Sequence, residues 1–394
     1  MGLLIRGGRV IDPGQGAAAE ADLLIEEGLI AEVAPEIAAA GHRVVDARGL
    51  IVAPGLVDMH VHLRDPGQTH KEDIATGTAA AVRGGFTTIA CMPNTLPPLD
   101  HPVALEYVRS RARDAGSCRV VPIAAITRGQ AGKELAPIAS LAAAGAVALS
   151  DDGVAVPDAG LLRRAMEYAG MAGLPIIEHC EDPALSGGGV MHEGAHSAAL
   201  GLAGQPGECE AVIVARDLLV AELTGARLHV AHVSTEASVR LIREAKRRGV
   251  RVTAEVTPHH LLLTDADVGE YDTNRKMNPP LRGADDLAAL RGGLADGTID
   301  AIATDHAPHA PEEKLVEFDR APFGVVGLET ALGVVLTRLV RPGLLSIEQV
   351  IRAMSWAPAR ILGLPAGTLE TGSAADVTVI DPARRWTVHA AGFA

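Results

Sequence analysis

Aromatic residues are scarce in this sequence, at 2% of the chain, so aromatic packing cannot supply much of a core. Apolar residues as a whole nevertheless make up 48% of the 394 residues, so the core must be aliphatic, built from Ala, Val, Leu and Ile. This composition fits a parallel α/β protein, whose strands are buried on both faces and appear as aliphatic runs. The length suits one large domain and a minor one.

Cysteine is also rare, and no two of the four residues form a CxxC pair; they are Cys91, Cys118, Cys180 and Cys209. Reduced, buried thiols in a cytoplasmic protein are therefore expected rather than disulfides. The first residues lack the basic start and long apolar region of a signal peptide. No apolar run reaches the length of about 18 residues that would predict a membrane span.

Basic residues are in deficit, because 35 Lys and Arg face 49 Asp and Glu, which gives a formal net charge of −14. No basic stripe compensates for this charge, so nucleic acid is not an expected partner. The same charge repels an anionic small-molecule substrate at long range. A site for such a substrate would need an Arg or a metal ion that reverses the field locally.

The two ends of the chain both contain β patterns. Residues 3–12 and 21–33 have the pattern of strand, turn and strand, and residues 367–381 have the same pattern. Because chain termini often lie close together, we expect residues 1–52 and 360–394 to form one composite small β-sandwich domain. The remaining residues, 53–359, would form the large domain.

In that large domain, aliphatic strand-like runs alternate with Ala-rich or amphipathic helical stretches. The candidate strands are residues 56–62, 87–93, 119–127, 145–150, 174–180, 227–234, 251–258 and 300–306. Eight such β/α units predict an α/β fold of the (β/α)8 TIM-like barrel type. Two connections, residues 181–226 and 259–299, are long, and long loops after barrel strands usually shape an active site.

Polar side chains stand at the carboxyl ends of nearly all these strands, where barrel enzymes place catalytic groups. In chain order they are His60 and His62, Asn94, Asp151 and Asp152, His179, His232, His259 and His260, and Asp305 and His306. His60 and His62 share one face because side chains alternate along a strand. Imidazole and carboxylate suit Zn²⁺ and similar ions, and buried imidazoles without a metal would be costly, so the set predicts a metal site.

Three further positions carry more specific expectations. Asp151 and Asp152 point to opposite sides, so one faces the site and the other caps the following turn, and periodicity does not choose between them. Arg64 follows His62 by two residues, and we expect it to bind a carboxylate group. His229 lies deeper in its strand and is expected to pack in the core. The segment from Asn278 to residue 282 is either a rigid turn or part of the site.

Seven motifs spread over nearly the whole chain belong together. They are residues 58–67 (DMHVHLRDPG), 92–94 (MPN), 150–153 (SDDG), 179–182 (HCED), 232–235 (HVST), 277–282 (MNPPLR) and 304–309 (TDHAPH). In combination they resemble the bacterial type I dihydroorotases, which are cyclic amidohydrolases of the amidohydrolase superfamily. Members of that family usually continue beyond the end of this chain with a stretch that closes the small domain.

The resemblance implies a hydrolase with two Zn²⁺ ions per subunit. His60, His62 and Asp305 would bind the first ion, His179 and His232 would bind the second, and Asp152 would bridge the two. Many superfamily members use a carbamylated lysine as the bridge, which a hydantoinase or allantoinase would be expected to show. The implied substrate-binding groups are His62, Arg64, Asn94, Asn278, His309, Phe323 and Gly324, the last two through their backbone.

The implied reaction is the reversible cyclisation of N-carbamoyl-L-aspartate to L-dihydroorotate in de novo pyrimidine (UMP) biosynthesis, through a metal-bridging hydroxide. Asp305 would be the catalytic proton carrier. Two alternatives stay open: another cyclic amidohydrolase of the hydantoinase or allantoinase type, and an inactive copy that serves as a scaffold for aspartate carbamoyltransferase. An active enzyme could also form a homodimer or work with that same partner.

Overall fold

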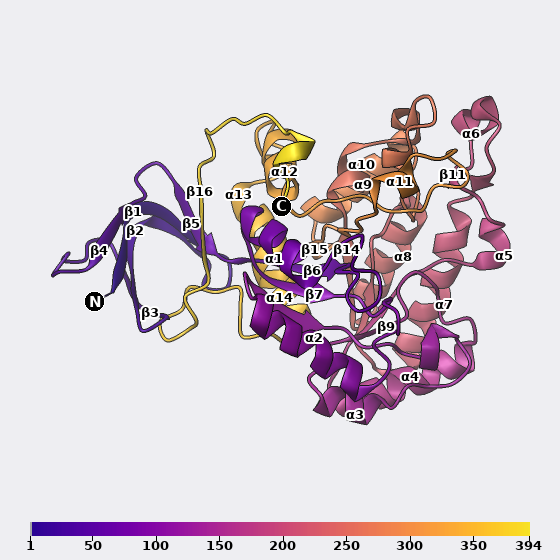
Figure 1. Cartoon of the computed structure of the whole chain (residues 1–394), viewed down its shortest axis with the longest axis horizontal. Coiled ribbons are helices and arrows are strands. Elements are labelled where there is room, and N and C mark those ends of the chain that lie inside the picture. The colour runs from indigo at the N-terminus through magenta and orange to yellow at the C-terminus, as the bar shows by residue number, and fades with distance from the viewer. Residues whose placement is uncertain (1) are drawn as a thin grey trace.

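Eight parallel strands form a closed ring in the computed structural model, which describes residues 2–394 (Figure 1). They are β6 (Leu56–Val61), β7 (Phe86–Cys91), β8 (Arg119–Pro122), β9 (Leu149–Ser150), β10 (Ile176–Glu178), β13 (Leu228–Val230), β14 (Val252–Val256) and β15 (Ala301–Ile302). Two runs of neighbours, β6-β7-β8 and β9-β10-β13-β14-β15, are each hydrogen-bonded in parallel. The predicted barrel fold is therefore confirmed, with every strand shorter than expected.

Two parallel bridges beyond the regular strands close the ring. One joins Ala124 to Leu149, and the other joins Val61 to His306. At the second bridge the backbone N–H of His62 donates to the carbonyl of His306 over 2.8 Å. The strands are short because the backbone leaves the regular ladder where the polar strand ends begin. Those ends are thus free to turn their side chains toward one another.

Helices surround the ring and cover its outer surface. They include α1 (Ile74–Arg83), α2 (Pro102–Ala115), α3 (Ile138–Ala143), α4 (Ala159–Ala172), α7 (Glu208–Thr224), α8 (Glu236–Arg247) and α10 (Ala284–Ala295). Local sequence sets their limits: α4 begins where the Asp158 side chain accepts from the N–H of Leu161 and ends at Gly173 in the left-handed conformation. Among residues 2–394, no helix combines the length and apolar character needed to cross a bilayer.

Shorter elements fill the long connections and the end of the barrel. After β10 come α5 (Pro183–Ser186), β11 (Met191–His192), α6 (Ala195–Leu200) and β12 (Gly204–Gln205), and after β14 comes α9 (Pro258–Leu262). After β15 come α11 (Pro311–Lys314) and α12 (Ala331–Val335). A continuous helical run then comprises α13 (Ile347–Ile351), a π-helical turn η5 (Arg352–Trp356) and α14 (Ala357–Leu362).

The core is aliphatic, as the composition predicts. Its largest cluster joins strand residues such as Leu56 and Ile89 to helix residues such as Ile74 of α1 and Leu162 of α4, all fully buried. It therefore lies between the ring and the surrounding helices, where most of the apolar area leaves water. All four cysteines are free thiols, and Cys118 is the one that is not fully buried.

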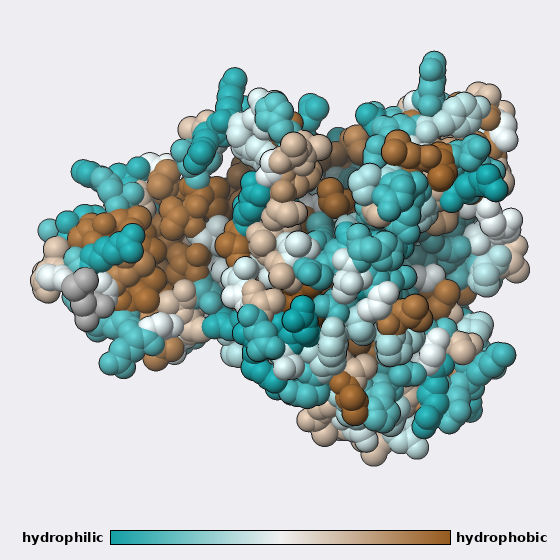
Figure 2. All heavy atoms as spheres, in the orientation of Figure 1, coloured by the Kyte–Doolittle hydropathy of each residue, from teal (hydrophilic) through white to brown (hydrophobic). Residues whose placement is uncertain are grey.

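Both ends of the chain contribute to one small sheet beside the barrel (Figure 1). Its strands are β1 (Leu3–Asp12), β2 (Ala17–Glu26), β3 (Leu29–Ala34), β4 (Arg43–Asp46), β5 (Ile51–Pro54) and β16 (Val377–Ile380). The order is β16-β5-β1-β2-β3, with β4 paired to β1, and β16 runs antiparallel to β5. Figure 2 shows hydrophobic residues gathered on the visible face of this sheet. The division of the chain into residues 1–52 with 360–394 and residues 53–359 stays a prediction.

Candidate metal centre

Six buried side chains converge at the carboxyl ends of five barrel strands. His60 lies in β6 and His62 directly follows it. The others are Asp152 after β9, His179 after β10, His232 after β13 and Asp305 after β15. None of them exposes more than 6% of its surface. The sequence prediction had named all six, and the structure brings them to one place.

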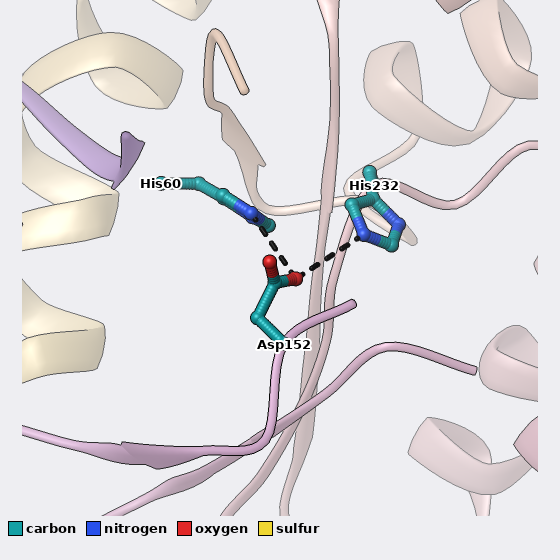
Figure 3. Close-up of side chains that lie close together, drawn as sticks. All are labelled: His60, Asp152 and His232. Atoms are coloured by element: carbon teal, nitrogen blue, oxygen red, sulfur yellow. Dashed lines mark ion pairs between the residues drawn. The ribbon is translucent and has the colours of Figure 1, made fainter. Parts of the chain in front are cut away.

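Asp152 lies in the middle of this cluster. Its Oδ1 atom is 3.3 Å from His60 Nε2, 3.6 Å from His232 Nε2 and 3.9 Å from His179 Nδ1. Its other oxygen, Oδ2, is 3.5 Å from His62 Nε2. Figure 3 shows the Asp152 carboxylate pointing between the His60 and His232 rings. One carboxylate thus faces four imidazoles.

Asp305 completes a second group on the opposite side. Its Oδ1 atom lies 3.0 Å from His62 Nε2 and 3.6 Å from His60 Nε2. Two sets of ligand atoms are each close enough to hold one metal ion: His60, Asp152 and His232, and His60, His62 and Asp305. The second set is the one that the sequence assigns to the first ion. His179 Nδ1 lies beside the other set, 3.0 Å from His232 Nε2.

The backbone is unusual at two of these positions. His232 and Asp305 adopt positive φ angles of 29° and 48°, in the region that residues other than glycine rarely occupy. Such conformations are unfavourable and persist where the surrounding structure holds them, most often at functional sites. Both residues lie within three positions of the end of a shortened strand, where the turn of the backbone directs their side chains into the cluster.

Asp151 and Asp152 have separate tasks. The Asp151 carboxylate accepts from the N–H groups of Ile126 and Thr127, at 2.8 and 3.0 Å, and from the Thr127 hydroxyl. It therefore satisfies backbone donors after β8, and the expectation that it caps the following turn was wrong. The reason is that the chain beyond β8 leaves the ladder with unpaired donors, which a neighbouring buried carboxylate can reach.

Glu255 is a residue that the sequence interpretation missed. It is fully buried on β14, with Oε1 2.6 Å from His60 Nδ1 and Oε2 3.2 Å from His229 Nε2. A carboxylate that accepts from the Nδ1–H of a histidine fixes the ring and turns Nε2 toward the metal position. A charged residue inside an otherwise aliphatic strand was the available signal, because buried carboxylates need a partner. His229 is buried, as expected.

Glu181 was missed as well. Its Oε2 atom lies 3.1 Å from His179 Nε2 and accepts from Asn278 Nδ2 over 2.6 Å. This contact occupies Nε2 of His179 and leaves Nδ1 to face Asp152 and His232. Asn278 therefore lies at the rim of the cluster. The segment from Asn278 to residue 282 thus contributes a side chain there and is not only a rigid turn.

The donor set fits a metal cation. The Nδ1–H groups of His60 and His62 are used by Glu255 and by Asn94 Oδ1, the latter at 2.8 Å. With neutral rings, their Nε2 lone pairs face carboxylate oxygens, so the arrangement needs a positive charge there, either a metal cation or a proton on the imidazoles. His60 Nε2 and Asp152 Oδ1 are buried and have no hydrogen-bond partner among residues 2–394. Imidazole with carboxylate is the donor set of zinc and related ions.

The charges of the cluster agree with this interpretation. Burial alone would raise the pKa of the Asp152 carboxyl, but the charges of His60 and its other imidazole neighbours outweigh burial and hold that pKa well below its usual range. The same balance between burial and the imidazoles, His62 first among them, lowers the pKa of Asp305. Both carboxylates are therefore ionised near neutrality and available as ligands.

The predicted substrate-binding residues surround the cluster. Asn94 contacts His62 and donates to Asp152 Oδ2 over 3.2 Å. Arg64 donates from Nε to the Pro308 carbonyl over 3.2 Å, and its Nη2 lies 3.5 Å from His309 Nε2. Burial lowers the pKa of Arg64, and the charges of Asp305 and Asp152 oppose that effect. A half-buried guanidinium thus stands beside the metal ligands.

The loop at residues 323–324 is fixed by close contacts. His309 Nε2 donates to the Phe323 carbonyl over 2.7 Å, and the Gly324 N–H donates to the carbonyl of Lys276 over 2.9 Å. Gly324 has a φ of +130°, and a Cβ atom there would lie 2.7 Å from the Ala307 carbonyl oxygen. Only glycine fits this position, which brings the backbone close to His309.

Known proteins are similar to this chain in sequence. A family model described as "Dihydro-orotase-like" matches residues 49–238. The dihydroorotase of Pelotomaculum thermopropionicum is 58% identical over 394 residues, which cover 100% of this chain and 92% of the relative. The dihydroorotase of Anaeromyxobacter sp. (strain K) is 57% identical over 392 residues, covering 99% and 90% of the two chains.

Solved structures show the same fold. The L-hydantoinase (dihydropyrimidinase) of Arthrobacter aurescens superposes with a TM-score of 0.84 at 29% identity, over 95% of this chain and 86% of that one. The D-hydantoinase (dihydropyrimidinase) of Thermus sp. gives a TM-score of 0.84 at 28% identity, over 99% and 89%. The fold is thus that of cyclic amidohydrolases. Among the proteins named here, the two dihydroorotases are 58% and 57% identical to this chain, whereas the two hydantoinases are 29% and 28% identical. The chain belongs to the dihydroorotase family.

Proposed function

We propose that this chain is a dihydroorotase, which interconverts N-carbamoyl-L-aspartate and L-dihydroorotate in pyrimidine biosynthesis. The observation that carries this proposal is the similarity to dihydroorotases along its whole length. The cluster of histidines and carboxylates at the barrel's strand ends supports it, because hydrolysis of a cyclic amide needs an activated water and a stabilised oxyanion. No comparable observation favours an inactive scaffold, and the chain keeps all six residues proposed as ligands, each of them buried.

The metal assignment is the finer part of the proposal. His60, His62 and Asp305 would hold one Zn²⁺ ion, His179 and His232 would hold a second, and Asp152 would serve both. When bound, such ions lower the pKa of water toward neutrality and polarise the amide carbonyl. The central place of Asp152, which faces four imidazoles, supports a bridging role.

Asp305 has the position and charge of a proton carrier. In the hydrolytic direction, its carboxylate accepts a proton from the attacking water and passes that proton to the departing ring nitrogen. In the direction of synthesis the same group works in reverse, by microscopic reversibility. Glu255 and Asn94 keep the His60 and His62 rings in the orientation that leaves their Nε2 atoms directed at the site.

Arg64 is the proposed binding group for the substrate carboxylate, with Asn94, Asn278, His309 and the backbone at Phe323 and Gly324 around the ring. A guanidinium binds a carboxylate through paired, charge-assisted hydrogen bonds. The Arg64 guanidinium also explains how a chain with a net charge of −14 can accept an anionic substrate, because it makes the charge at the binding position positive.

The remaining assignments follow from the same family membership. We propose that residues 1–52 and 360–394 act as the small domain beside a barrel of residues 53–359, which the pairing of β16 with β5 supports. We further propose that the enzyme works in the cytoplasm. Assembly as a homodimer or with aspartate carbamoyltransferase stays a prediction of the resemblance.

Substrate comparison tests the proposed function. Dihydroorotate and dihydrouracil share one ring, and only dihydroorotate carries the carboxylate that Arg64 would bind. We expect kcat/KM for dihydroorotate to exceed that for dihydrouracil by about 10³ or more, because a site built around a half-buried charge rejects a partner that leaves this charge unpaired. Arg64→Gln should lower kcat/KM for dihydroorotate about a hundredfold and leave dihydrouracil nearly unchanged.

The matched control for this experiment is Arg164→Gln, which removes a guanidinium from the exposed surface of α4. It should leave both rates unchanged. Turnover of dihydrouracil or hydantoin at the rate of dihydroorotate would contradict the proposed substrate. An Arg64→Gln variant with unchanged discrimination would contradict the role of Arg64 while leaving the reaction itself intact.

A further inference from the structure

A second cavity lies at the other end of the barrel, at the amino ends of the strands. Its volume is about 560 Å³, within the usual range for small-molecule sites. The starts of β13 and β14 form one wall, the segment from α10 to β15 forms another, and η5 with α14 closes it. The metal ligands stand at the carboxyl ends of the same strands, so the cavity is separate from the candidate metal centre.

Four arginines line this cavity: Arg227, Arg251, Arg352 and Arg360. Among residues 2–394, none of them has a carboxylate within 4.0 Å. Two acidic residues, Asp296 and Asp300, share the lining, but each is already paired: Asp296 with Arg243 at 2.9 Å and Asp300 with Lys246 at 2.7 Å. The cavity therefore carries unneutralised positive charge in a chain of net charge −14.

Backbone carbonyls hold two of these guanidinium groups in place. Arg227 donates to the carbonyls of Gly173 and Ile361, at 2.5 and 3.4 Å, and Arg251 donates to Gly225 at 3.2 Å. These bonds orient the side chains and leave their charges uncompensated. Burial, together with the charge of Arg251, lowers the pKa of Arg227.

An aromatic ring and aliphatic side chains complete the lining. The Arg352 guanidinium lies over the Trp356 ring, 4.1 Å from its centroid. Leu228, Val252 and Leu294 are among the apolar side chains that line the rest of the cavity. The cavity thus combines a cluster of guanidinium groups with an apolar surface. Guanidinium forks match the oxygens of phosphate, and an apolar cavity wall accommodates a flat ring.

We propose that this cavity is a binding site for a phosphorylated small molecule with a flat ring, of the mononucleotide class. A phosphate presents more negative charge and more oxygens to guanidinium groups than a single carboxylate does. The proposal goes beyond the dihydroorotase reaction, and it stands whether or not the metal centre has the proposed substrate.

Tryptophan fluorescence provides a direct test, because the chain has only two tryptophans and Trp356 lines the cavity. Trp386→Phe leaves Trp356 as the only reporter. UMP titrated into this variant at low salt should change its fluorescence saturably, with a Kd below about 0.1 mM. Calorimetry on the unmodified chain should give the same Kd. Uridine and inorganic phosphate should each bind at least about tenfold more weakly.

Variants locate the binding. In the Trp386→Phe background, Arg352→Gln combined with Arg360→Gln should weaken UMP binding at least about tenfold, because both arginines are exposed and their removal leaves the core intact. Arg164→Gln and Arg64→Gln should leave it unchanged. Circular dichroism confirms that each variant is folded.

Five results would overturn the proposal, four of them measured without the Arg64→Gln variant. Those four are the absence of UMP binding up to about 10 mM, equal binding of UMP and uridine, equal binding of UMP and inorganic phosphate, and undiminished UMP binding in the double variant. Loss of UMP binding in Arg64→Gln would also overturn it, because the nucleotide would then occupy the metal centre.

Discussion

Replacement of Asp305 by Asn is expected to lower kcat for dihydroorotate by about 10³ or more. The carboxylate lies 3.0 Å from His62 Nε2 in a buried cluster and is held ionised there, so it can accept a proton. An amide has nearly the same shape and keeps an oxygen for a metal ion, but it cannot take up and release the proton that the reaction moves. Steady-state kinetics in both directions measure the effect.

The control for this variant is Asp319→Asn, the same change at an exposed position, which should keep normal kcat. Metal content must be measured alongside, since Asp305 is also a proposed ligand. The proton-carrier role is contradicted if kcat falls only in proportion to the metal that is lost. It is equally contradicted if the variant retains its activity.

Asp152→Ala should lose bound metal, whereas Asp151→Ala should keep it. The Asp152 carboxylate faces four imidazoles, while the Asp151 carboxylate binds the N–H groups of Ile126 and Thr127. Removing Asp151 leaves buried donors unsatisfied, at a cost of about 1–3 kcal/mol for each such group. We therefore expect Asp151→Ala to lower Tm and Asp152→Ala to abolish activity.

Metal analysis after exhaustive dialysis, together with thermal unfolding, separates these effects. The two variants change the same residue type at adjacent positions, so each is the control for the other. Equal metal content in Asp152→Ala and the unmodified chain would contradict the bridging role. Greater metal loss in Asp151→Ala would exchange the two assignments.

The sequence pattern alone predicts the barrel and the polar residues at its strand ends because both depend on short-range rules; the family resemblance then implies which six of those residues are ligands. Strands of a parallel barrel are aliphatic runs, and catalytic groups lie at their carboxyl ends. A polar residue that follows such a run is therefore a candidate for the active site. The choice between Asp151 and Asp152 has no such signal. It depends on the donors that the chain after β8 leaves unpaired, which only the folded chain brings near Asp151.

Residues that act across strands are harder to find from sequence. Glu255 lies 195 residues from its partner His60, and Glu181 contacts Asn278 from 97 residues away. The arginine-lined cavity is a stronger case. Two of its arginines directly precede β13 and β14, and the other two lie in η5 and α14. No local sequence pattern links those four segments. Such sites become visible only when the tertiary structure places these side chains side by side.

The central claim is that this chain is a metal-dependent dihydroorotase, and removal followed by restoration of metal tests it most directly. The purified chain is stripped with a chelator, assayed for dihydroorotate hydrolysis, and titrated with Zn²⁺ while bound metal is measured. The account predicts that the stripped protein retains less than about 1% of the activity and that activity returns as bound metal approaches about two equivalents per chain. Full activity in the folded, metal-free protein would contradict it, as would a metal-loaded, folded protein that fails to hydrolyse dihydroorotate.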